Sequence, residues 1–246
     1  MEGLLHSNLA LQAPSPAAAP LAPRSRGEIL DRYRRFRMLS KEHNSAAVKR
    51  TPTDAFIEQA RRLGIARGRT LRLNSEDELA LVWDLVIYAR REGRQRALDR
   101  YASSQQLPSD SDEARVLSAM LAARFAFVRV ERRHPAAGLI VSDLLREEEL
   151  WLVDEGLEAT APVGCTFATR LYAPEDFHMT AGVIVPLDRS LLASVLVRRP
   201  RLARVDLDEL SDDRRFAQAI YREAIEAGVM KQIRFLDPPE LAKRAG

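Results

Sequence analysis

The chain has 246 residues, 46% hydrophobic and 30% charged, with a formal net charge of +3 at pH 7. These values are typical of a folded globular protein and exclude a collagen-like or fully disordered chain. The single cysteine, Cys165, excludes an internal disulfide, and no run reaches the roughly 18 to 20 apolar residues that a membrane-spanning helix needs. We expect no metal and no cofactor, and a reducing, cytoplasmic location.

The first 26 residues are rich in alanine and proline, and they contain one acidic residue and two arginines. They lack the basic start and continuous apolar core of a secretory signal. We expect residues 1–26 to form a disordered tail, with a transit peptide as the alternative.

Residues 24–50 carry nine lysines and arginines against three acids, a net charge of +6. Ile29, Tyr33 and Phe36 recur at helical spacing, which predicts an amphipathic helix with an arginine-rich face. The favoured interpretation is an ordinary helix docked by its apolar side. The alternatives are a contact to nucleic acid and a contact to an anionic membrane surface or acidic partner. The candidate contact residues are Arg32, Arg34, Arg35 and Arg37.

Residues 27–124 are expected to form a helical region. A helix is predicted over residues 52–63, because proline is tolerated in a first turn and Gly64 can end a helix in the left-handed conformation. Another is predicted over residues 112–124, where acidic residues in the first turn suit the helix dipole.

The most apolar helix is predicted between these two. Ser75 and Glu78 fit a capping box that opens it. From residue 79 to residue 89 its only polar side chain is that of Asp84, which predicts a central, buried position. The aromatic residues Trp83 and Tyr88 are expected to pack in the core rather than to bind a ligand.

Residues 125–187 contain short runs of β-branched and aromatic residues separated by turn residues, which predicts an antiparallel unit. Five short strands indicate a small β-barrel-like module or a strongly curled sheet, in which Gly182 would suit a bend. Apolar and polar residues do not alternate strictly, so we expect helices to cover both faces. The runs are residues 125–132, 138–145, 149–154, 165–172 and 177–186.

Residues 188–246 predict C-terminal helices that pack back on the rest of the chain. Asp188 is placed to cap one helix, residues 211–213 to start another, and Gly228 to end it. The predicted fold class is therefore α+β, with a helical N-terminal part, a small five-stranded antiparallel module and C-terminal helices.

No group of side chains carries a strong catalytic signal. The common signatures for nucleotide binding, zinc proteases and serine hydrolases are absent. Cys165 alternates with apolar residues along its strand, which predicts a buried, inert thiol. His134, Asp143 and His178 are the candidates for an acid–base or metal cluster, although lone histidines are more often structural.

The predicted β unit, residues 125–187, has a net charge of −5 and would repel a phosphate backbone. We therefore expect the basic segment 24–50 to dock on this acidic unit. The favoured function is that of a non-enzymatic, intracellular binding or interaction protein with a protein partner. The alternatives are a nucleic-acid-associated protein that uses residues 24–50 and an enzyme with an unrecognised His/Asp site.

Overall fold

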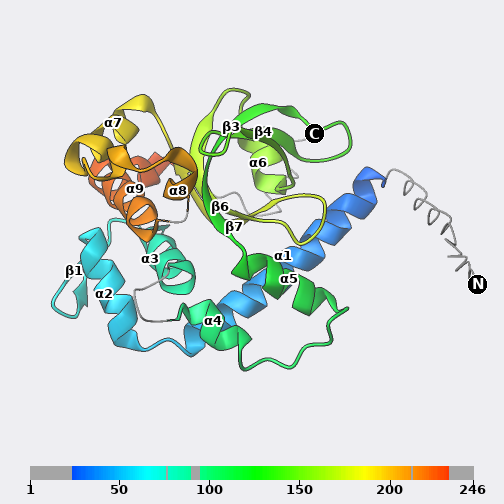
Figure 1. Ribbon diagram of the computed structural model, residues 1–246, viewed down its shortest axis with the longest axis horizontal. Helices are drawn as coiled ribbons and strands as arrows, with labels where there is room; N and C mark the ends of the chain where they lie inside the picture. The colour runs from blue at the N-terminus through cyan, green and yellow to red at the C-terminus, as the bar shows by residue number, and fades with distance from the viewer. Residues whose placement is uncertain (1–23, 76, 90–94, 212, 233–246) are drawn as a thin grey trace, which may run out of the picture.

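The computed structural model describes residues 24–75, 77–89, 95–211 and 213–232. Helices precede and follow a five-stranded antiparallel sheet, so the predicted α+β class is confirmed (Figure 1). The elements before the sheet are α1 (Arg26–Lys49), α2 (Thr53–Leu63), β1 (Ala66–Arg67), β2 (Thr70–Leu71), α3 (Asp77–Tyr88), α4 (Ala97–Ala102) and α5 (Asp112–Leu121). Those after it are α7 (Arg189–Arg198), η1 (Leu202–Arg204), α8 (Leu207–Leu210), α9 (Arg214–Ala227) and η2 (Val229–Gln232).

The five-stranded sheet has the order β5-β4-β3-β6-β7, with the longest strand in the centre. Val128 of β3 pairs with Asp143 on one side and with Phe167 on the other. The pairing of β6 with β7 shifts register beside Gly182, whose φ of +107° favours glycine. The strands are β3 (Arg124–Arg133), β4 (Leu139–Asp143), β5 (Glu148–Leu152), β6 (Thr166–Tyr172) and β7 (Met179–Pro186), and α6 (Glu155–Thr160) lies between β5 and β6.

The predicted barrel-like closure is not confirmed, because no closed barrel is found among the described residues. β5 and β7 are the edge strands of the sheet. Their ends meet at one place, where the His178 amide donates to the Trp151 carbonyl at 2.7 Å and the Val153 amide donates to the His178 carbonyl at 2.9 Å. These hydrogen bonds link the two edges beside His178.

Both faces of the sheet are covered, as predicted, but not by the same kind of element. On one face Phe125 of β3 contacts Phe216 and Tyr221 of α9, with ring centroids 6.0 and 5.6 Å apart. The other face includes Val128 and packs against Leu157 of α6 and against apolar residues from neighbouring strands. The second face is therefore covered by the β unit itself rather than by flanking helices.

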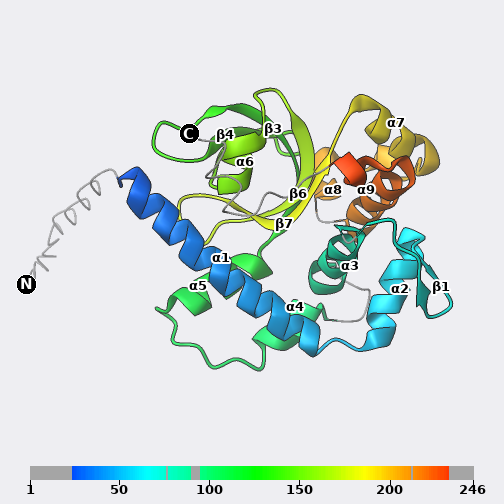
Figure 2. The ribbon, with the colours of Figure 1, turned by 180° about the vertical axis from the view of Figure 1, so that it is seen from behind.

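The long helix α1 begins near the β unit and ends beside α4 (Figure 2). Its predicted apolar side is buried, since Ile29, Tyr33 and Phe36 are at most 6% exposed and belong to one hydrophobic core. Phe36 lies against Phe177, with ring centroids 6.2 Å apart. The expected docking of this helix on the acidic unit is what the structure shows.

The structure tests only part of the predicted tail and none of the predicted segment boundaries. Residues 1–23 lie outside the described residues, as do residues 233–246. Ser25, however, caps α1, and Arg26 is its first residue, so the last part of the expected tail is helical. The division into segments 27–124, 125–187 and 188–246 stays a prediction, and one hydrophobic core draws residues from all three.

The predicted capping box at Ser75 is wrong. The Ser75 hydroxyl is buried without a hydrogen-bond partner among the described residues. The Glu78 carboxylate instead accepts hydrogen bonds from the backbone and side-chain amides of Asn74, at 2.9 and 3.0 Å. The residue that faces Glu78 is thus one position earlier than the pattern indicated.

Candidate functional site

The four arginines of α1 that were candidates for nucleic acid or an acidic partner all have acidic partners within the chain. Most of these partners lie on the β unit or its loops, and the others begin α5. The ion pairs are Arg32–Asp112, Arg32–Glu175, Arg34–Glu155, Arg35–Glu113 and Arg37–Asp154, with N–O distances of 2.6, 2.8, 2.6, 2.8 and 2.7 Å. The basic face is therefore directed at the protein's own carboxylates.

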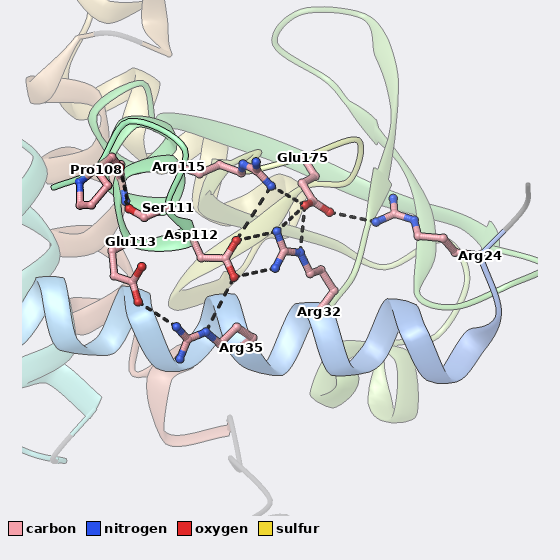
Figure 3. A network of polar contacts seen from close by, with 10 residues as sticks. Arg24, Arg32, Arg35, Pro108, Ser111, Asp112, Glu113, Arg115 and Glu175 are labelled. Carbon is pink, nitrogen blue, oxygen red and sulfur yellow. Dashed lines mark hydrogen bonds and ion pairs between the residues drawn. The ribbon is translucent and has the colours of Figure 1, made fainter. Parts of the chain in front are cut away.

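Two of those carboxylates, Glu175 and Asp112, form the centre of one polar network (Figure 3). Glu175 accepts hydrogen bonds from Arg24, Arg32 and Arg115, each close to 2.9 Å. The hydrogen bond from Arg32 lowers the pKa of Asp112, against the opposing effect of burial. Burial would raise the pKa of Glu175, but hydrogen bonds from Arg32 and Arg24 bring it below its ordinary value.

Both lowered pKa values predict a loss of stability in acid. A carboxylate whose folded-state pKa is lowered stabilises the fold above its unfolded pKa of about 4, and this contribution disappears as pH falls through the folded-state value. We expect Arg32→Gln to lower the free energy of unfolding by about 1 kcal/mol at pH 7, a small value because the partly exposed network is screened by solvent. Near pH 3 the loss should be smaller, because the carboxylates become protonated. Urea unfolding from pH 7 to pH 3 measures this.

The control for this pH experiment is Arg100→Gln. Arg100 is exposed, and its guanidinium donates a hydrogen bond to the Gln95 carbonyl rather than to a carboxylate. Its substitution should leave the slope of stability against pH as in the natural chain. Equal slopes for all three proteins would contradict a stabilising role for the network.

Arg37 is the most enclosed of the four arginines. Its guanidinium donates to the Thr180 carbonyl at 2.6 Å, to Asp154 at 2.7 Å and to the Tyr33 hydroxyl at 3.2 Å. Asp154 also caps α6 by accepting from the Leu157 amide at 3.1 Å. Arg37 thus joins α1 to the start of α6 and to β7.

The predicted cluster of His134, Asp143 and His178 assembles only in part. His134 stacks on Trp151, with ring centroids 4.3 Å apart and planes inclined by 18°. Asp143 and His178 are both influenced by Arg124. The Nη2 atom of Arg124 lies 3.6 Å from Asp143 Oδ2. The pKa of His178 is lowered mainly by burial and further by the charge of Arg124. His134 therefore has an aromatic partner, whereas Asp143 and His178 share the charge of Arg124.

In the Asp143–Arg124–His178 group only Asp143 is fully buried, and Arg124 also pairs with Glu148. Burial raises the pKa of Asp143, with Arg124 opposing that rise. Among the described residues, Asp143 Oδ2, Arg124 Nε and His178 Nδ1 are enclosed without a hydrogen-bond partner. Nor do three potential metal ligands gather anywhere in the part of the chain that the structure describes.

Cys165 is half-buried rather than fully buried as predicted. It precedes the first residue of β6, Thr166, and packs at the edge of the core beneath the sheet. Burial raises the pKa of its thiol. A thiol with a raised pKa is less reactive at neutral pH, in keeping with the inert role expected of it.

A buried ion pair joins α3 to the sheet. Arg170 of β6 donates to both carboxylate oxygens of Asp84, from Nε and Nη2 at 3.0 Å each. Tyr221 of α9 donates to the same carboxylate at 2.9 Å. The Arg170 guanidinium also lies over the Tyr88 ring, 5.0 Å from its centroid. Residues from three distant segments thus meet at Asp84.

Arg170 also lines a pocket of about 130 Å³, here called the Arg170 pocket. Its walls come from the end of α3, the start of α4, the turn between α5 and β3, β6, and the start of α9. Arg96, Arg170 and Arg214 are its cationic side chains, and Asp213 is its one carboxylate among the described residues. The other lining residues are Tyr88, Ala89, Leu121, Ala122, Ala123, Phe125, Ser211 and Ala217.

Sequence reasoning did not find this pocket, although two residues gave a signal. Asp84 is the single charged residue in the apolar run 79–89, and Arg170 is the single charged residue in the run 165–172. A buried charge needs a partner of opposite sign, so the two could have been paired from sequence. Arg96 and Arg214 stand in ordinary polar surroundings and carried no such signal.

Residues 28–229 match the model of a family of unknown function, DUF7986. The chain belongs to this family. The match runs from α1 to the first residue of η2 and includes every residue of the Arg170 pocket. No curated protein and no solved structure matches the chain. In this DUF7986 chain, no helix among the described residues is both long and apolar enough to span a membrane.

Proposed function

We propose that this protein is a non-enzymatic binding protein that holds a small ligand in the Arg170 pocket. One observation supports the proposal most: the pocket has charged walls, but its lining includes no histidine, cysteine or lysine among the described residues. Burial raises the pKa of Tyr88, and the hydrogen bond from Arg215 lowers that of Asp213. Both shifts move the pKa of the group away from neutral pH, which suits binding better than acid–base catalysis.

A second hollow, of about 440 Å³, is a weaker candidate. It lies between α1, α3 and β7, and its lining includes Trp83, Ile87 and Gly182. Among the described residues its one carboxylate is that of Asp84, whose oxygens already accept hydrogen bonds from Arg170 and Tyr221. The Arg170 pocket thus offers more polar groups that can fix the orientation of a ligand than this second hollow does.

The test is to block the pocket at Ala122, an exposed residue that lines it. The control is Ser118→Trp, since Ser118 is exposed on α5, the helix that Ala122 follows, and does not line the pocket. We expect native mass spectrometry of the freshly purified full chain to show a bound small molecule, retained by Ser118→Trp and lost by Ala122→Trp. A natural chain without any bound molecule, or equal retention by both variants, would contradict the proposal.

The two alternative functions are less favoured proposals. A nucleic acid bound to residues 24–50 would have to displace the internal partners of Arg32, Arg34, Arg35 and Arg37. An enzyme built on Asp143 and His178 would use two groups whose pKa shifts favour their neutral forms. A cytoplasmic setting, and a partner protein, belong to the favoured proposal.

A further inference from the structure

We infer that the ligand of the Arg170 pocket is a small oxyanion, either free or as the anionic end of a larger molecule. This inference rests on the proposed binding function and names the chemistry of its ligand. Guanidinium groups are the usual partners of carboxylate and phosphate oxygens, because their N–H donors match the geometry of these anions.

Two of the pocket's arginines are held in place by hydrogen bonds from Nε and Nη2, which leave the third nitrogen, Nη1, without a partner among the described residues. Arg170 uses Nε and Nη2 for Asp84, and Arg96 uses Nε and Nη2 for Asp99 and the Leu121 carbonyl. Nη1 of each has no hydrogen-bond partner among the described residues, yet neither is fully enclosed. Solvent therefore reaches both Nη1 atoms, although Arg170 and Arg96 are only 6% and 8% exposed.

The third arginine supplies uncompensated charge. Arg170 is balanced by Asp84, Arg96 by Asp99, and the pocket's Asp213 by Arg215. Arg214, half-buried at the first position of α9, has no ion-pair partner among the described residues. Among the described residues, the side chains named here therefore sum to one positive charge, which favours an anion.

The size of the pocket limits the part of the ligand that enters it. A volume of about 130 Å³ has room for several water-sized groups. A phosphate or carboxylate group fits such a volume. Tyr88, Phe125 and the alanines of the lining supply its apolar surface.

The experiment is a calorimetric titration of the full chain with inorganic phosphate, in buffer free of other oxyanions. We expect saturable one-to-one binding that Arg214→Gln weakens about 10- to 100-fold, because charge-assisted hydrogen bonds are lost. The matched control is Arg222→Gln on the same helix. Arg222 pairs with Glu226 and does not line the pocket. The phosphate affinity of the Arg222→Gln variant should therefore stay within about 2-fold of that of the natural chain.

A second titration uses glycerol phosphate. Tighter binding of this ester than of phosphate would support an anionic end on a larger ligand, and equal or weaker binding would support a free ion. No saturable phosphate binding, or equal affinities for Arg214→Gln and Arg222→Gln, would overturn the oxyanion inference. Native mass spectrometry could still find an uncharged ligand that the Ala122→Trp variant loses. In that case the proposed binding function would stand and the oxyanion inference would not.

Discussion

Replacing Asp84 with alanine is expected to lower the free energy of unfolding by about 3–5 kcal/mol. The substitution leaves the Arg170 guanidinium buried without its carboxylate partner, and the Tyr221 hydroxyl without its acceptor. The side chains of Arg170 and Asp84 are only 8% and 2% exposed, so water replaces the lost carboxylate only in part. Urea unfolding of the full chain measures the loss.

Two further variants separate a lost ion pair from a general loss of packing. Asp54→Ala breaks an exposed pair, in which Asp54 and Arg69 are 79% and 69% exposed, and should cost less than about 1 kcal/mol. Asp84→Leu combined with Arg170→Met removes both charges and should recover much of the stability lost by Asp84→Ala. A cost below about 1 kcal/mol for Asp84→Ala would show that the buried pair is unimportant.

Replacing Arg37 with alanine is expected to cost about 3 kcal/mol, far more than the same change at Arg34. Arg37 hydrogen bonds to Asp154, to Tyr33 and twice to Thr180, so its removal leaves several enclosed polar groups without a donor. Arg34 pairs with Asp31 and Glu155, but its side chain is 57% exposed.

The comparison between these two arginines also bears on function. Arg34→Ala should cost less than about 1 kcal/mol, because exposed ion pairs contribute little. Thermal and urea unfolding of both variants measure the difference. If Arg37→Ala were as mild as Arg34→Ala, the arginine face of α1 would be available to partners, and the nucleic-acid alternative would gain support.

The sheet and the docking of α1 could be predicted because their signals are local. Each of the five runs of β-branched and aromatic residues overlaps one strand, with ends that differ by at most two residues. The spacing of Ile29, Tyr33 and Phe36 identified the apolar side of α1, and that side is buried. Opposite net charges on residues 24–50 and 125–187 then indicated which surfaces would meet.

Shorter elements were missed because their signals are weak. Helix α6 has six residues, and its cap Asp154 looks in the sequence like the end of a strand. The hairpin of β1 and β2 has two residues in each strand, too few to show a period. At Ser75 the S-x-x-E pattern was present, but Asn74 offered the Glu78 carboxylate two donors instead of one.

The candidate pocket could not be derived from sequence because it is built from distant segments. Arg96, Arg170 and Arg214 are each separated by more than 40 residues, and they meet only once α3, α9 and the sheet share a core. The histidine cluster shows the same limit. Asp143 and His178 come to one arginine through the pairing of strands, while His134 is drawn to Trp151.

The most direct test of the binding function is a crystal structure of the full chain grown with inorganic phosphate. We predict an anion in the Arg170 pocket, within hydrogen-bond distance of Arg170 Nη1 and of the Arg214 guanidinium. An anion bound elsewhere, or a pocket filled by the protein's own side chains, would contradict this account.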